Sequence, residues 1–248
     1  MPESGGVEIL KDVDDFWQWY LGPGLSVALR DAGVDIAPNK NKLLVSGDSA
    51  GAWPALYSWI SSQGKPYIRT LYLHYPMLRH YHRESSNSQE MNIGGRMVTR
   101  KEVEKNVDQL WRKVQDLHNA NLCPTITKRT PPDGSICNTK LWFAHQWRTV
   151  FQRAGPTPDI IDQVLEAEVG NLPVVFIHHG TMDLNVPIEH TRNFVNKLKK
   201  THYAHDTDRI HFHETEGESH GYDHNFNEEE HEWLLNILNE ISTQWTGD

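Results

Sequence analysis

The segment 47–51, with the sequence Gly-Asp-Ser-Ala-Gly, carries the residue types of a serine nucleophile on a sharp turn. It follows an apolar run, 42–46, that is typical of a strand, and a helical pattern continues from Ala50 to about residue 62. A serine at such a corner adopts strained backbone angles, and glycines two positions away on either side avoid collisions across the turn. We therefore predict that Ser49 is a nucleophile and that the Ala50 N–H group and the helix N-terminus stabilise an oxyanion beside it.

The same five residues also fit a purely structural interpretation. Serine is a good helix N-cap, so Ser49 could merely begin the helix after a glycine-rich connection. The pattern is short enough to recur by chance. A carboxylate and a histidine placed later in the chain are needed to favour catalysis over capping.

Both of these residue types follow, in the order that an α/β-type triad requires. The apolar run 172–178 is typical of a buried parallel strand and leads into a loop that contains Asp183. The next predicted strand, 209–214, leads into a loop that contains His220. Because the carboxyl ends of parallel strands meet at one edge of a sheet, we predict a relay from Ser49 through His220 to Asp183, with heavy-atom distances of roughly 2.6 to 3.2 Å. The alternative acids, should Asp183 lie too far away, are Glu214, Glu216 and Glu218.

These motifs resemble those of the α/β-hydrolase superfamily, and within it the hormone-sensitive-lipase-like branch (fold-3), fungal type. The elbow residues Gly47, Asp48, Ser49, Ala50 and Gly51 match that branch's Gly-Asp-Ser-Ala-Gly motif, and the segment 218–222 is similar to its His-Gly-aromatic segment. The resemblance extends over essentially the whole chain from Pro2. It implies a partial α/β-hydrolase fold, a mainly parallel sheet flanked by helices. It also implies Ser49 as nucleophile, His220 as general base and Asp183 as the orienting carboxylate, without a cofactor.

The sequence departs from the resembled family in one respect. Family members carry a His-Gly-Gly-Gly loop upstream of the elbow that supplies oxyanion N–H groups, and the chain shows no such segment. We therefore expect a single domain over residues 1–248 that is truncated at its N-terminus. Its elbow strand should lie at the sheet edge and pair only with the strand near residues 71–73. Because one lost oxyanion donor slows catalysis by about 100- to 1000-fold, we expect slow turnover of activated esters by this form.

The remaining elements frame the three loops. A helix is predicted for 12–32 and a strand for 68–76. The segment 79–170 is polar and interrupted by Gly and Pro pairs, which indicates an insertion between strands. It resembles the family's helical lid, which covers the site, and a solvent-facing decoration is the alternative. Its helical patterns lie at 101–120, 138–154 and 158–169.

Composition excludes some partners. The chain has 248 residues, 38% hydrophobic and 23% charged, and a net charge of −9 without a large basic cluster, so nucleic acid is not an expected partner. No run of about 18 apolar residues predicts a membrane span, and a cytoplasmic location is expected. Cys123 and Cys137 are too few for a disulfide framework; two reduced thiols or one bridge are the alternatives.

Fifteen histidines raise the question of a metal site. His211 and His213 alternate on a predicted strand and so share a face, and His220 and His224 follow downstream. No cysteine or His-x-x-x-His helix completes a zinc site, and His220 is the expected base of the triad. We therefore predict no metal.

The sequence leaves three functions open. The main prediction is a serine hydrolase, a carboxylesterase that cleaves small-molecule esters through an acyl-enzyme. The segment 179–187 also resembles the Asp loop of prolyl-oligopeptidase-type serine peptidases, which share the fold and triad. A non-catalytic binding protein that lost its oxyanion loop is the third. In each case His178 and His179, beside the Asp183 loop, are predicted to form a wall of the site.

Overall fold

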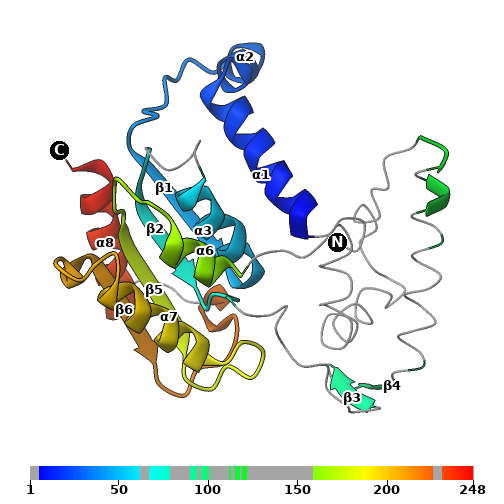
Figure 1. Cartoon of the computed structure of the whole chain (residues 1–248), viewed down its shortest axis with the longest axis vertical. Coiled ribbons are helices and arrows are strands. Elements are labelled where there is room, and N and C mark those ends of the chain that lie inside the picture. Colours follow the sequence, from blue (N-terminus) through cyan, green and yellow to red (C-terminus); the bar gives the residue numbers. More distant parts are fainter. Residues whose placement is uncertain are drawn as a thin grey trace. The chain divides into compact units, whose positions relative to one another are not determined.

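The computed structural model describes residues 6–61, 67–78, 90–93, 96–99, 159–225 and 231–247, together with isolated residues between 101 and 121. It divides into two compact units. One unit comprises Leu10–Arg79 and Pro158–Asp248 and contains the main sheet (Figure 1). The other comprises Met1–Ile9 and His80–Thr157. Its described part includes an antiparallel hairpin of β3 (Glu90–Ile93) and β4 (Arg96–Thr99).

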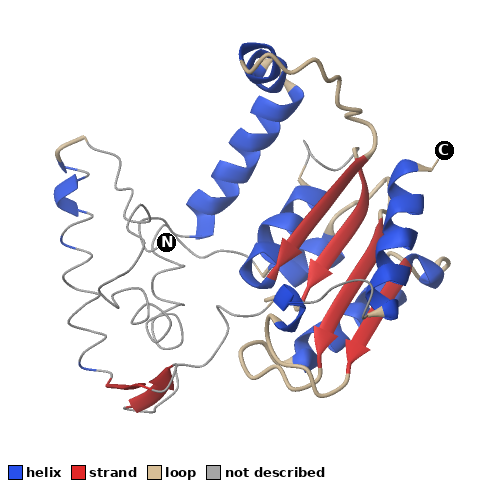
Figure 2. Ribbon diagram, turned by 180° about the vertical axis from the view of Figure 1, so that it is seen from behind, coloured by secondary structure: helices blue, strands red, loops and turns tan. Residues whose placement is uncertain are grey.

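Four parallel strands form the main sheet (Figure 2). Their order across the sheet is β1 (Leu43–Asp48), β2 (Ile68–His74), β5 (Val174–Gly180) and β6 (Ile210–Thr215). All seven residues of β5 are buried, as expected for a central parallel strand rich in apolar residues. Among the described strands, β1 pairs only with β2, which confirms the predicted edge position of the elbow strand for this part of the chain.

Helices cover both faces of this sheet. Those on one face are α3 (Ala52–Ile60), α6 (Ile160–Glu166) and α7 (Ile188–Lys200) (Figure 1). On the other face α8 (Glu232–Thr246) packs against β2 and β5, where its Ile241 joins Tyr72 and Phe176 in the core. The chain is therefore an α/β protein with a parallel sheet flanked by helices, as predicted, and this architecture is consistent with a partial α/β-hydrolase fold.

The single helix predicted for 12–32 is wrong, because the structure has two helices there. They are α1 (Gly6–Leu21) and α2 (Gly24–Asp31). Pro23 lacks the backbone N–H that would continue α1, and it disfavours helical angles at the preceding residue. Gly22 directly follows α1 and lies close to the helix backbone, since a Cβ at this position would be 2.7 Å from the Gln18 carbonyl oxygen. The Gly-Pro pair therefore marks the break.

The predicted insertion is described only in part. The helix predicted for 158–169 is present as α6, which belongs to the unit that contains the sheet and contacts α3. Asp159 caps it by accepting a hydrogen bond from the Ile161 N–H. The helical pattern at 138–154, like Cys123 and Cys137, lies outside the described residues, so a lid over 79–170 stays a prediction. No helix in the described ranges is both long and apolar enough to cross a membrane.

Candidate active site

Ser49 lies at the sharp turn that the sequence predicts. It directly follows β1 and begins a short 3-10 helix (Ser49–Gly51) that leads into α3. Its φ of 49° lies in the left-handed region, which costs a non-glycine residue conformational energy. A backbone hydrogen bond of 2.9 Å from the Met77 N–H to the Ser49 carbonyl holds this corner against the segment after β2. The strained serine is thus held between the end of β1 and the segment after β2.

The two elbow glycines have different importance. A Cβ at Gly47 would lie 2.4 Å from the Gly51 carbonyl oxygen, so only glycine fits there. A Cβ at Gly51 would meet nothing nearer than Asp48 Oδ1 at 3.5 Å, and Gly51 has an ordinary helical φ of −67°. The expectation that both glycines prevent collisions therefore holds for Gly47 and is wrong for Gly51. The backbone of residue 51 lies where a side chain at position 47 would be, whereas a Cβ at position 51 would make only ordinary van der Waals contact.

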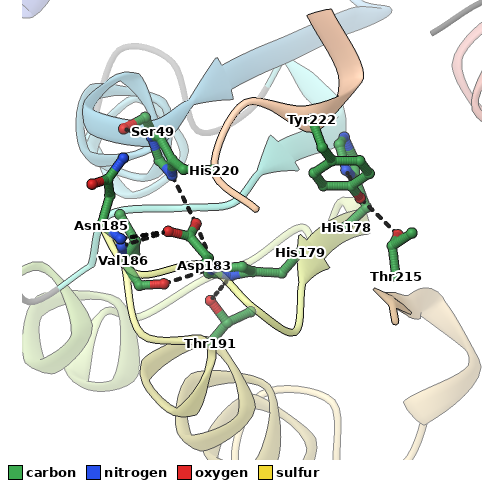
Figure 3. Close-up of polar contacts among 10 residues, drawn as sticks. All are labelled: Ser49, His178, His179, Asp183, Asn185, Val186, Thr191, Thr215, His220 and Tyr222. Carbon is green, nitrogen blue, oxygen red and sulfur yellow. Dashed lines mark hydrogen bonds and ion pairs between the residues drawn. The ribbon is translucent and has the colours of Figure 1, made fainter. Parts of the chain in front are cut away.

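The structure brings Ser49, His220 and Asp183 together (Figure 3). His220 Nε2 lies 3.0 Å from Ser49 Oγ, and His220 Nδ1 lies 2.7 Å from Asp183 Oδ2, both within the range expected from the sequence. An ionised carboxylate only accepts hydrogen bonds, so Nδ1 carries the proton and donates to Asp183. In the neutral imidazole Nε2 is then an acceptor that faces the Ser49 hydroxyl. This is the tautomer that can remove a proton from Ser49.

The Asp183 carboxylate is held by the backbone of its own loop. Asp183 Oδ1 accepts hydrogen bonds from the N–H groups of Asn185 and Val186, each at 2.8 Å. Burial alone would raise the pKa of Asp183, but hydrogen bonds from His179, His220 and the Val186 N–H hold that pKa well below its usual range. Asp183 is therefore ionised at neutral pH and can stabilise an imidazolium at His220.

A second imidazole, that of the buried His179, also contacts Asp183. His179 Nε2 lies 3.2 Å from Asp183 Oδ2 and 3.0 Å from the Val186 carbonyl oxygen, while Nδ1 lies 2.9 Å from Thr191 Oγ1. Both neighbours of Nε2 are acceptors, so Nε2 carries the proton, and Nδ1 accepts from the Thr191 hydroxyl. His179 is fully buried, and its Nε2–H faces Asp183. The sequence indicated only a wall residue.

The loops that carry Asp183 and His220 are joined by their backbones. The Thr181 N–H donates to the Thr215 carbonyl at 3.0 Å, and the Met182 N–H donates to the Glu218 carbonyl at 2.9 Å. A Cβ at Gly180 would lie 2.3 Å from the Glu218 carbonyl oxygen, so glycine is needed where β5 ends. This close approach brings the loop of Asp183 next to the loop of His220.

One alternative acid has its own partner. Glu214 accepts a hydrogen bond of 3.0 Å from Arg192 Nε, and this contact with Arg192 lowers the pKa of Glu214. Glu218 contributes its backbone carbonyl to the loop contact described above. Asp183 is thus the carboxylate that contacts His220.

The four histidines weighed as zinc ligands do not converge. His211 stacks on Phe176 with its Nδ1 3.3 Å from Glu240 Oε1, and His213 stacks on Trp233. His220 turns instead toward Ser49, and His224 Nε2 lies 3.4 Å from the Tyr75 hydroxyl. The alternation of 211 and 213 therefore reflects packing of this strand face against α8.

The comparisons with known proteins identify no family. No protein-family model matches the chain, and no curated protein matches it. Among solved structures, an esterase from the Planctomycetes species Thermogutta terrifontis with bound butyrate is 16% identical, with a TM-score of 0.47 over 98% of this chain and 69% of that one. A monoacylglycerol lipase from Paleococcus ferrophilus is 15% identical, with a TM-score of 0.46 over 98% and 77%. An esterase from Exiguobacterium antarcticum is 13% identical, with a TM-score of 0.40 over 91% and 74%.

The chain is also shorter than these structures. It spans 69%, 65% and 61% of three Thermogutta terrifontis chains. At such identities and TM-scores the likeness carries no argument about activity.

Proposed function

We propose that the chain is a serine hydrolase of the α/β-hydrolase type that cleaves carboxylic esters of small molecules. The observation that carries this proposal is the continuous relay from Ser49 Oγ through His220 to Asp183, with 3.0 and 2.7 Å between the heavy atoms. Helix capping alone would require none of these contacts. Nucleophilic catalysis requires all of them.

The chemistry follows from the protons assigned above. Ser49 Oγ attacks the ester carbonyl while its proton passes to His220 Nε2, and ionised Asp183 stabilises the imidazolium. The Ala50 N–H lies in the first turn of the 3-10 helix, where no helical carbonyl precedes it, so it is suited to hold the oxyanion. His220 then protonates the leaving alcohol, and water releases the acyl group from Ser49.

A fluorophosphonate probe tests the nucleophile directly. We expect labelling of the unsubstituted chain and loss of labelling in Ser49→Ala, with ester turnover reduced by about 10⁴- to 10⁶-fold, as for other interacting triads. Ser242→Ala is the matched control, since Ser242 is exposed on α8 and should keep both labelling and turnover. Equal labelling of Ser49→Ala and the unsubstituted chain would overturn the proposal.

Substrate assays separate the remaining alternatives. Hydrolysis of p-nitrophenyl acetate without hydrolysis of aminoacyl anilides supports an esterase, and the reverse result supports a prolyl-oligopeptidase-type peptidase. A chain that is neither labelled nor active would be a binding protein that retains the triad geometry without turnover.

A further inference from the structure

Three side chains outside the triad converge at the carboxyl ends of two central strands. His74 ends β2 and His178 lies in β5, and the register places these two residues side by side. Asp223 lies in the turn after His220. Asp223 Oδ2 lies 2.9 Å from His74 Nδ1 and 3.5 Å from His178 Nε2, and one ligand atom from each residue lies within 4.8 Å of the others. This set is the one such cluster among the described residues.

One nitrogen of this cluster is buried without a hydrogen bond. It is His178 Nε2, whose 3.5 Å contact with Asp223 Oδ2 does not have hydrogen-bond geometry. A buried polar atom without a partner is costly, so this nitrogen calls for a further binding partner. Both histidine and carboxylate are metal ligands.

The other nitrogen of His178 is already engaged. His178 Nδ1 lies 2.8 Å from the Tyr222 hydroxyl, which lies 2.7 Å from Thr215 Oγ1 (Figure 3). When Nδ1 donates to Tyr222 and Tyr222 donates to Thr215, the lone pair of His178 is left on Nε2, facing Asp223. Histidines that bind metals almost always have their second N–H fixed in this way.

We propose that His74, His178 and Asp223 bind a divalent transition-metal ion, with Zn²⁺ the best match. Zinc accepts two imidazoles and one carboxylate at about 2.0 to 2.2 Å in a tetrahedron, which separates the ligand atoms by about 3.4 Å. The contacts of 2.9 and 3.5 Å around Asp223 Oδ2 are close to that spacing. The proposal departs from the sequence expectation of no metal, and it uses none of the four histidines weighed there.

Such an ion would be structural with respect to the triad. It would join the ends of β2 and β5 to the turn that follows the proposed base, since Asp223 lies three residues after His220. It shares no ligand with Ser49, His220 or Asp183. The alternative is a metal-free network in which His74 simply donates a hydrogen bond to Asp223.

Metal binding is measured on the whole chain. After treatment with a chelator and dialysis against Zn²⁺, we expect one zinc per chain by mass spectrometry and a higher Tm than in chelator. With Co²⁺ we expect the intense visible absorption of tetrahedral coordination. His74→Asn should lose the zinc, and this partly exposed residue is the ligand whose replacement disturbs packing least. His211→Asn is the matched control, because His211 also faces a carboxylate, that of Glu240, but has no third ligand.

Tyr222→Phe separates metal binding from packing. It removes only the hydroxyl that fixes His178, so zinc affinity should fall about 10- to 100-fold, as with other partners of metal ligands. No retained zinc, no tetrahedral cobalt absorption and no change in Tm in the unsubstituted chain would overturn the proposal. Equal zinc in the unsubstituted chain and His74→Asn would overturn it as well. The cobalt measurement uses the unsubstituted chain, so it decides the question even if a variant fails to fold.

Discussion

Replacing His179 by leucine tests whether the second imidazole on Asp183 orients the proposed triad. In the fold Asp183 accepts hydrogen bonds from His220, Asn185, Val186 and His179, so the substitution removes one donor of four and leaves the carboxylate in place. A hydrogen bond to a charged group contributes about 1.5 to 3 kcal/mol. At 1.36 kcal/mol per tenfold change in rate, its full loss from the transition state would lower kcat/KM by about 10- to 160-fold.

The same substitution should also destabilise the fold. It leaves the Val186 carbonyl and the Thr191 hydroxyl without their buried partner, and each such group costs about 1 to 3 kcal/mol. The free energy of unfolding should therefore fall by roughly 2 to 6 kcal/mol in His179→Leu. His179→Gln is the matched control, because its amide N–H can still donate to Asp183. It should keep most of kcat/KM while still losing stability, since Thr191 loses its acceptor.

The assay combines kcat/KM for p-nitrophenyl acetate, the rate constant of fluorophosphonate labelling and denaturant unfolding. A folded His179→Leu chain within twofold of the unsubstituted kcat/KM would refute the orienting role. So would a loss as large as the roughly 10⁴-fold expected for Asp183→Asn, because three donors to the carboxylate remain. Because this prediction rests on the proposed function, Ser49→Ala is measured in parallel.

Three further predictions use other contacts. Gly47→Ala should abolish fluorophosphonate labelling or folding, because a Cβ there collides with the backbone of residue 51. Gly51→Ala should label normally, and its free energy of unfolding should equal that of the unsubstituted chain or exceed it by about 0.4 to 1 kcal/mol. Equal damage in both variants would contradict the crowding at residue 47. Burial lowers the pKa of His178 to about 3 in the folded chain, whereas the pKa of an exposed imidazole is about 6.5. Between these two pH values the unfolded chain therefore binds a proton at His178 that the folded chain does not bind. The free energy of unfolding, measured with chelator present, should therefore fall as pH drops through this window, and His178→Leu should show a shallower dependence. Glu214→Ala breaks only an exposed pair with Arg192 and should change stability by less than about 1 kcal/mol and leave kcat/KM unchanged; a large rate loss would reopen the choice of acid.

The convergence of the three proposed triad residues was predictable because it depends on chain order and on strand ends. Ser49 and Asp183 each follow an apolar run, and His220 follows a run in which Ile210 and Phe212 alternate with polar residues. Both patterns indicate strands, and parallel strands bring the loops that follow them to one edge. The break at Pro23 was equally visible as a Gly-Pro pair, and a prediction of one helix gave too much weight to apolar periodicity. The elbow strand's place at the edge followed from the resemblance, not from the residues alone.

The neighbours of the triad were not predictable, because they depend on which way each side chain faces. His178 and His179 are adjacent in β5 and so point to opposite faces, one toward Tyr222 and the other toward Asp183. Sequence could place both beside the site but could not assign either face. The pairing of His74 with His178 depends on the register of β2 against β5, which no local pattern specifies.

The joined loops after β5 and β6 determine how this site can open. Because the Thr181 and Met182 N–H groups bond to the Thr215 and Glu218 carbonyls, Asp183 and His220 belong to one local folding unit. A fluctuation that breaks these bonds disturbs both partners at once, whereas movement of the serine corner alone leaves the carboxylate and imidazole paired. Amide hydrogens of Thr181 and Met182 should thus exchange with solvent together, at a rate distinct from that of Met77, which anchors the serine corner.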